Sequence, residues 1–419
     1  MTVRLSDDDR ALLEGRSGDG LALAMRVLLA VADTMGAQEL LDITGAHIDG
    51  CLYQGPVGLD FVERLAADGA KVRVPTTLNV ASLDLMHPEL FRGDPAEAAA
   101  SRRLMQAYEN LGCRPTWTCA PYQLAARPGF GEQVAWAESN AIVFANSVLG
   151  ARTHRYGDFL DVCAALTGRA PAAGLHLLEN RRGQIVFDVS ALPEALLNSD
   201  VVFPALGHVV GSRAGKAVPV LVGLPAASED QLKALGSAAA AAGAVGMFHA
   251  VGITPEAPSL EAALHGGAAE ATVAVTSTLI RQARDELTTA PDGPIGAVSV
   301  GTPHASLAEM RRVVELLAGR SVSPGIEAYI STGRDVAEQA ATAGLDGRLA
   351  AAGFTVVTDT CTYITPILRT TGPVMTDSAK WAYYAPANIG VEVVFGSIVE
   401  VVESAVAGRV RRDAGLWSD

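Results

Sequence analysis

The chain has 419 residues, 49% of them hydrophobic, and a formal net charge of −14. This length is enough for two or three packed lobes with a sizeable core. The negative charge disfavours a nucleic-acid partner, because binding to a phosphate backbone needs an excess of positive charge. The apolar run 21–32 contains Arg26 and is shorter than the ~20 residues that span a membrane, so no membrane partner is expected.

The N-terminus and the cysteine content both bear on the compartment. The first residues, MTVRLSDDDRALLEG, contain no apolar segment behind a basic start, so no secretory signal is expected. Five cysteines, an odd number spread over the chain, favour a reducing compartment over a disulfide framework. We therefore expect a cytoplasmic protein.

Segments typical of helices and strands alternate along the chain. Ser6 followed by three aspartates is typical of a helix start. The expected strands are 39–47, 71–79, 140–147, 217–224, 244–252, 296–301, 325–332 and 354–360, and the expected helices include 58–69, 228–242, 305–318 and 333–344. Buried β-branched runs between helices of this length predict an α/β fold with mainly parallel sheets wrapped by helices.

Three of the predicted strand-end loops carry a cysteine: Cys51, Cys119 and Cys361. Their wide separation in the sequence excludes a local zinc ribbon or ferredoxin motif. Three thiolates meeting over one cleft would leave a metal with an open position, which suits Lewis-acid chemistry. The alternative is that they are small buried hydrophobic residues. That alternative fits Cys113 and Cys163 better, since Cys163 lies on an apolar helix face.

Several longer segments resemble a known family. They are AHIDGCLY, VPTTLNVASLDL, CRPTWTCAPYQ, AWAESNAIVFANSVLGARTHRYGDFLD, TDTCTYITP and KWAYYAPANIGVEVVFGS. They are similar to the catalytic-domain signatures of aconitase X, a branch of the aconitase superfamily, and the match covers almost the whole chain. The resemblance implies a single catalytic domain over 1–419 with aconitase-like α/β/α lobes around a central cleft. The expected lobes are 1–170, 171–290 and 291–419, since composition shifts near 168–182 and 286–294.

The resemblance also implies a hydro-lyase with an iron-containing centre. Cys51, Cys119 and Cys361 would hold the iron, and Lys380, Glu138 and His47 would be the catalytic side chains. Polar strand-end residues would bind the substrate without adding charge. The substrate-binding residues expected on this basis are Gly50, Leu52, Thr76, Thr77, Asn79, Ser139, Asn140, Asn146 and Thr302. For several of these residues a purely structural role stays open. Lys380 and Glu138 could be surface residues, His47 a structural histidine, and Thr76 and Thr77 turn caps.

Two departures from the archaeal members of the family affect the cofactor and the substrate. Thr302 stands where those members carry a cysteine, and HIDGCLY stands where they resemble HISGVSY. The loss of one thiol and the gain of Cys51 favour a 2Fe–2S cluster, with mononuclear iron or a 4Fe–4S cluster as alternatives. The same departures favour cis-3-hydroxy-L-proline as the substrate over phosphomevalonate.

A further departure concerns the small swivelling domain that carries the catalytic serine in aconitase-like enzymes. The family match begins within the first residues, so this domain is expected to be a separate small subunit, and this chain alone would be incomplete.

Three other functional classes compete with the dehydratase. A non-catalytic iron–sulfur protein would need the thiols but not the polar loops. A nicotinamide oxidoreductase would need a GxGxxG turn between a strand and a helix, and none is found. A thiol hydrolase would need a cysteine beside a histidine and an acid, a role open to His304 and Asp359.

Overall fold

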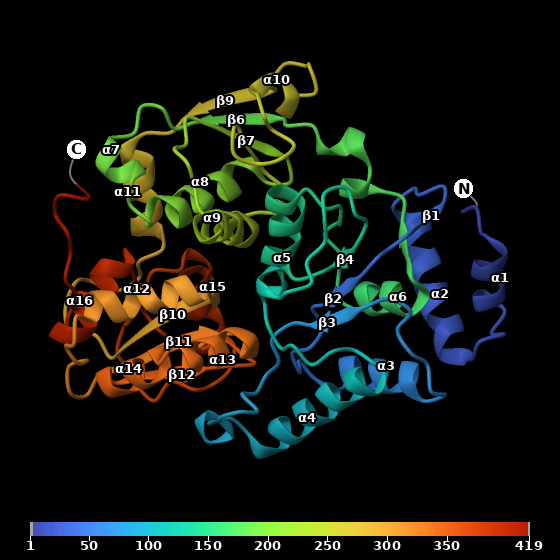
Figure 1. Cartoon of the computed structure of the whole chain (residues 1–419), viewed down its shortest axis with the longest axis horizontal. Coiled ribbons are helices and arrows are strands. Elements are labelled where there is room, and N and C mark those ends of the chain that lie inside the picture. The colour runs from blue at the N-terminus through green and yellow to red at the C-terminus, as the bar shows by residue number, and fades with distance from the viewer. Residues whose placement is uncertain (1–2, 418–419) are drawn as a thin grey trace. The chain divides into compact units, whose positions relative to one another are not determined.

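The computed structural model describes residues 3–417 (Figure 1). The chain divides into two compact units. Unit 1 comprises Met1–Leu83 and Gly93–Arg182, and unit 2 comprises Asp84–Arg92 and Gly183–Asp419. Within 3–417, no helix is both long enough and apolar enough to cross a membrane.

Unit 1 is built on a small parallel sheet of strand order β3-β2-β4, and β1 pairs with β5 in an antiparallel ribbon. Helix α6 packs against β2 and β4, while α2 packs against α6 and α3 (Figure 1). The elements are α1 Asp7–Leu13, α2 Asp19–Thr34, β1 Leu40–Asp42, β2 Ala46–Ile48, α3 Pro56–Ala66, β3 Thr76–Leu78, α4 Pro95–Asn110, β4 Ala135–Trp136, α5 Ser139–Phe144, α6 Leu160–Thr167 and β5 Arg169–Pro171.

The predicted helix start at Ser6 is confirmed, because Ser6 and Asp9 form a capping box at the start of α1. The predicted strand at 39–47 is instead two short strands, β1 and β2, which belong to different sheets. The prediction of a strand at 140–147 is wrong. This apolar segment forms α5 and a π-helical turn, Ala145–Leu149, because the Glu138 carboxylate accepts the backbone N–H of Ala141 and so begins a helix.

A buried arginine holds the π-helical turn in place. Arg181 is completely buried, and its guanidinium donates to the Asn146 side-chain oxygen at 3.0 Å and to the Asn146 carbonyl at 3.0 Å. It also donates to the carbonyls of Leu175 and Ala151 at 2.9 and 3.1 Å. Of these acceptors, Asn146 lies in the π-helical turn, Ala151 follows the turn and Leu175 is distant in the sequence, so the guanidinium of Arg181 ties the turn to its neighbours.

Unit 2 contains two parallel sheets, of strand orders β8-β7-β6-β9 and β12-β11-β10-β13-β14. With the sheets of unit 1, they confirm the predicted α/β class with mainly parallel strands. The elements are β6 Ile185–Asp188, α7 Glu194–Leu197, α8 Val202–Ala214, β7 Pro219–Val222, α9 Glu229–Ala242, β8 His249–Ala250, α10 Leu260–Ala263, β9 Ala271–Ala274, α11 Ser277–Glu286, β10 Ala297–Ala305, α12 Leu307–Leu317, β11 Glu327–Thr332, α13 Arg334–Thr342, α14 Leu345–Ala352, β12 Phe354–Val357, β13 Val374–Thr376, α15 Ala379–Ile389, β14 Val393–Phe395 and α16 Ile398–Ala407.

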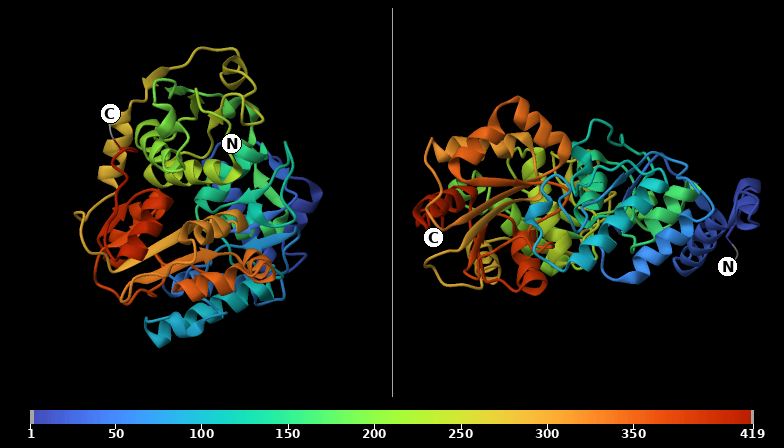
Figure 2. Two further views of the ribbon diagram at one scale, coloured as in Figure 1. Left: turned by 60° about the vertical axis from the view of Figure 1, so that its left-hand side comes forward. Right: turned by 90° about the horizontal axis from the view of Figure 1, so that it is seen from below.

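The five-stranded sheet has helices on both sides (Figure 2). One face, with Val298, Ile330 and Met375, packs against apolar residues of α12, α14 and α16. Helix α15 packs against β10, β13 and β14 and against α8 and α9. Capping boxes at Ser228, Ser306 and Ser397 begin three of these helices, which fixes the positions of their N-termini.

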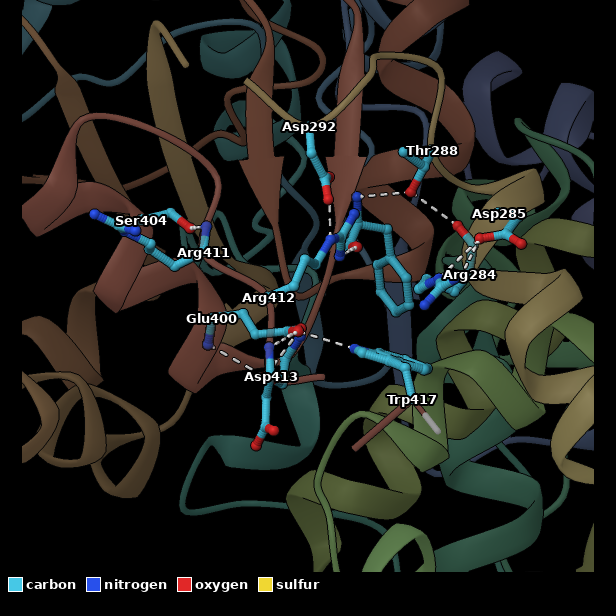
Figure 3. A network of polar contacts seen from close by, with 12 residues as sticks. Arg284, Asp285, Thr288, Asp292, Glu400, Ser404, Arg411, Arg412, Asp413 and Trp417 are labelled. Carbon is cyan, nitrogen blue, oxygen red and sulfur yellow. Dashed lines mark hydrogen bonds and ion pairs between the residues drawn. The ribbon is translucent and has the colours of Figure 1, made fainter. Parts of the chain in front are cut away.

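The last described residues of unit 2 are tied to the five-stranded sheet by a polar network (Figure 3). The Trp417 indole donates to the Glu400 carboxylate at 2.9 Å, and the Asp413 backbone N–H donates to the same oxygen at 2.9 Å. Arg412 donates to the Phe395 carbonyl at 2.6 Å, and Arg284 stacks over the Trp417 ring at 4.9 Å. These contacts join α11, β14 and α16.

Replacing Arg181 with Met should destabilise unit 1, because several buried carbonyls would lose a charged donor. The expected loss is about 3 kcal/mol or more, the usual cost of breaking a buried charged network. Arg102→Met, at an exposed position on α4, is the control and should change stability by less than about 0.5 kcal/mol. Chemical denaturation followed by circular dichroism measures both, and equal midpoints for the two variants would contradict this role of Arg181.

Candidate active site

In unit 1, three parallel strands bring polar loops to one edge of the sheet. Asp49, Gly50 and Cys51 follow β2, Asn79 follows β3, and Glu138 follows β4 within two residues. The backbone N–H of Thr118 donates to the Leu78 carbonyl at 3.1 Å, so the segment leading to Cys119 runs beside β3. The residues after β2, β3 and β4 lie at carboxyl ends of strands, where α/β proteins bind ligands.

The Cys51 loop is held from several sides. The Asp161 carboxylate, in the first turn of α6, accepts the backbone N–H of Asp49 at 2.6 Å. The Tyr108 hydroxyl donates to the Gly50 carbonyl at 2.9 Å. Cys51 is completely buried, and burial followed by the charges of Asp161 and Asp49 raises the pKa of its thiol. A bound cation is therefore the natural counter-charge for a Cys51 thiolate.

Asn79 presents an acceptor at this edge of the sheet. Its Nδ2 donates to the Asp49 carboxylate, and its backbone N–H donates to the Ile48 carbonyl at 2.9 Å. Its Oδ1 is buried without a hydrogen-bond partner among residues 3–417. A buried polar atom without a partner is costly, so Asn79 Oδ1 is suited to an external hydroxyl or amine donor.

The amide of Asn140 positions the Cys119 backbone. Asn140 Nδ2 donates to the Cys119 carbonyl at 2.6 Å and to Glu138 Oε2 at 2.8 Å, while the Tyr122 hydroxyl donates to its Oδ1 at 2.8 Å. Glu138 is buried and caps α5, with its Oε2 accepting the Ala141 N–H at 2.7 Å. These two predicted site residues therefore organise the loop around Cys119 in addition to any contact with a ligand.

His47 is a neutral, buried imidazole beside this loop. Burial lowers its pKa to about 4, against the opposing effects of the Glu138 charge and the Thr118 backbone. Its Nδ1 lies 2.8 Å from the Thr77 hydroxyl, and its ring lies 6.0 Å from that of Trp136. At neutral pH the ring carries no charge. It can therefore donate a hydrogen bond at one nitrogen and accept one at the other, but it does not supply a cation.

The remaining predicted residues of unit 1 lie in different surroundings. The amide of Asn146 is engaged by Thr153 and Arg181, with all three hydrogen bonds at 3.0 Å. The Thr76 hydroxyl donates to the Val74 carbonyl at 2.8 Å, as expected for a turn cap. Ser139 donates to Glu138 at 3.2 Å, and Leu52 is half-buried next to Cys51.

In unit 2, the second half of the predicted site lies at the carboxyl edge of the five-stranded sheet. Cys361 follows β12, and His304 lies near the end of β10. Both are buried, and they offer ligand atoms within 4.8 Å of each other. His304 Nε2 lies 3.1 Å from the Thr360 carbonyl. A thiol and an imidazole at this separation are chemically suited to one iron or zinc ion.

Thr302 lies on β10, and Lys380 lies on α15, a helix that packs against β10. Lys380 is buried in the first turn of α15, where the backbone N–H groups of the helix add to its positive charge. The Ser378 hydroxyl caps this helix and also donates to the Thr302 carbonyl. The Thr302 hydroxyl is buried and has no hydrogen-bond partner within residues 3–417.

An ion triad centred on the buried Lys233 supports the end of β10. Lys233, on α9, contacts Asp230 at 3.0 Å and also binds Glu309, and its Nζ lies 3.4 Å from the His304 carbonyl. Burial lowers the pKa of Lys233, but Glu309 and Asp230 outweigh that effect and raise it. The triad joins α9 and α12 next to the strand that carries Thr302 and His304.

Sequence reasoning missed the supporting role of several residues. No sequence pattern points to Asp161, Tyr108 or Lys233. Asp161 does belong to the segment RYGDFLD, which is part of the resemblance to the family. The sequence suggests a role for His304 only in a hydrolase, whereas in the structure His304 lies beside Cys361. Cys113 is buried and lies near the Cys51 loop, because a charge on Cys113 would act on Cys51.

Models of one protein family match most of the chain. The aconitase X first domain matches 2–179, the second domain 183–285 and the third domain 295–407. The crystal structure of Thermococcus kodakaraensis aconitase X in its holo-form superposes with a TM-score of 0.86 at 31% identity, covering 96% of this chain and 100% of that one.

Relatives of known activity are dehydratases. A cis-3-hydroxy-L-proline dehydratase of Pseudomonas aeruginosa is 43% identical over 99% of this chain and 72% of that protein. A second, of Hypocrea jecorina, is 41% identical over 97% and 69%. The phosphomevalonate dehydratase large subunit of Methanothermobacter thermautotrophicus is 36% identical over 96% and 98%. By these matches over nearly its whole length, the chain belongs to the aconitase X family.

Proposed function

We propose that this chain is the large subunit of a hydro-lyase that dehydrates cis-3-hydroxy-L-proline to Δ1-pyrroline-2-carboxylate. The observation that carries the proposal is the 43% identity to a cis-3-hydroxy-L-proline dehydratase, against 36% to a phosphomevalonate dehydratase large subunit. The presence of Cys51, and of Thr302 in place of a cysteine, supports the same choice of substrate.

The donor set fits an iron centre. Cys51, Cys119 and Cys361 are buried thiols that form no disulfide, and thiolates are preferred ligands of iron and of iron–sulfur clusters. We propose that these three cysteines ligate one centre, most simply a 2Fe–2S cluster. His304, with its ligand atom near Cys361, is a fourth candidate that suits the mononuclear alternative. When bound, the iron supplies a Lewis acid for the departing hydroxide.

The residues of the chain would bind and orient the substrate. Lys380, buried at the start of α15, is suited to the substrate carboxylate, because a cation and helix N–H groups both favour an anion there. Asn79 Oδ1 would accept a hydrogen bond from the substrate amine or hydroxyl. The neutral His47 would relay a hydrogen bond, and Glu138 and Asn140 would keep the Cys119 loop in position.

We further propose that the base, a serine, lies on a separate small swivel subunit in the same compartment, the cytoplasm. This chain matches 98% of the length of proteins named as large subunits, which supports a two-subunit enzyme. It matches 72% and 69% of the two hydroxyproline dehydratases, which are longer chains. Five cysteines that form no disulfide are consistent with a reducing compartment.

The first test is turnover of a substrate panel by the chain alone and by the chain co-produced with a genome-neighbouring small subunit. The complex should dehydrate cis-3-hydroxy-L-proline and leave 5-phosphomevalonate unchanged. The chain alone should be slower by ~10²–10⁴-fold, the usual cost of a missing general base. Turnover of 5-phosphomevalonate alone would overturn the substrate, and full activity without the small subunit would overturn the partner.

The second test concerns the iron ligands. Cys51→Ser, Cys119→Ser and Cys361→Ser should each lower the iron content at least about tenfold, because a hydroxyl is a poor iron ligand. Cys163→Ser is the matched control, since Cys163 is equally buried on α6, and its iron content should equal that of the wild type. Iron and acid-labile sulfide per chain provide the readout. Full retention of iron in Cys51→Ser would refute the proposed ligand set.

The third test concerns Lys380. Lys380→Ala should raise KM and lower kcat together, with kcat/KM reduced by about 10²-fold or more, since the contact both binds and orients the carboxylate. Lys216→Ala, at an exposed position after α8, is the control and should leave both constants unchanged. An unaltered KM in Lys380→Ala would show that this lysine does not hold the substrate carboxylate.

A further inference from the structure

The carboxylate of Asp161 is completely buried, yet it is surrounded by backbone donors of the Cys51 loop. Its Oδ2 accepts the N–H of Asp49 at 2.6 Å, and its Oδ1 accepts the N–H of Val162 at 2.7 Å. The N–H of Gly50 adds a third hydrogen bond. Two of these three donors belong to the residues that lead directly into Cys51.

All three contacts use the Asp161 carboxyl group as a hydrogen-bond acceptor. Burial raises the pKa of Asp161 to about 7, and the N–H donors of Asp49, Val162 and Gly50 oppose this rise because they favour the ionised form. A buried carboxylate is costly unless several hydrogen bonds satisfy it, and the backbone of the loop provides them. If the loop moved, the charge would lose its donors, so Asp161 and the Cys51 loop constrain each other.

Two further side chains fix the same loop from other sides. The Tyr108 hydroxyl donates to the Gly50 carbonyl at 2.9 Å, and Asn79 Nδ2 donates to the Asp49 carboxylate. There is no spare room: a Cβ added at Gly50 would lie 2.9 Å from the Tyr108 hydroxyl. The backbone before Cys51 is therefore held through both its N–H and its C=O groups.

We propose that Asp161 is a positioning residue for the iron centre, fixing the loop so that the Cys51 sulfur is presented in the geometry that ligation requires. The inference rests on the proposed function and deepens it. Residues that orient metal ligands in this way typically contribute a factor of 10–100 to metal affinity.

The test compares two equally buried aspartates of unit 1 in the holoenzyme. Asp161→Asn places an NH₂ or a weaker acceptor against the loop, and should release iron to a chelator about 10–100-fold more readily, with an altered visible absorption spectrum. Asp9→Asn is the control, because Asp9 is 1% exposed and forms the capping box of α1 and an ion pair with Arg169. It should lower the unfolding midpoint without changing the iron spectrum or its release.

Tyr108→Phe is a second variant, which keeps the ring and removes only the hydroxyl that binds the Gly50 carbonyl. It should release iron up to about tenfold more readily. Wild-type iron release and spectra in both Asp161→Asn and Tyr108→Phe would overturn this inference while the proposed function stands. A wild-type protein that binds no iron would instead overturn the proposed function, and the inference with it.

Discussion

Parallel strands deliver all their carboxyl ends to one edge of a sheet, and this constraint determines where the chemistry of the chain can lie. In unit 1 it places Cys51, Asn79 and Glu138 after neighbouring strands. In unit 2 it places His304 and Cys361 at one edge of the five-stranded sheet. Residues far apart in the sequence are thus gathered within each unit without any local motif.

A position at the end of a strand does not by itself fix a side chain. In this protein, buried polar networks fix the loops that carry these side chains. Glu138 and Asn140 fix the Cys119 loop, Asp161 and Tyr108 fix the Cys51 loop, and Lys233 supports the strand that carries His304. Each network brings a charge or an amide into the interior, which is tolerated only when its hydrogen bonds are made. The positions of these loops therefore depend on the hydrogen bonds of the buried polar residues that hold them.

The sequence predicts much of this architecture because local signals and hydrophobic patterns agree. The helix at 228–242 is confirmed as α9, beginning at the capping box of Ser228. The strand predicted at 140–147 is wrong because this apolar run is compatible with either a strand or a helix. The contact that decides for a helix is the Glu138 cap. The strand-end positions of Cys51 and Cys361 could be predicted, whereas the role of Asp161 could not, because its partners on the Cys51 loop lie far away in the sequence.

We propose above all that Cys51, Cys119 and Cys361 ligate one iron centre. The most direct measurement is an anomalous difference map, recorded at the iron absorption edge, from crystals of the protein grown without exposure to oxygen. We expect one iron centre, with two iron atoms if it is the 2Fe–2S cluster, in which the sulfurs of all three cysteines are bonded to iron. Iron bound elsewhere, or a map in which the Cys51 sulfur has no iron neighbour, would contradict it.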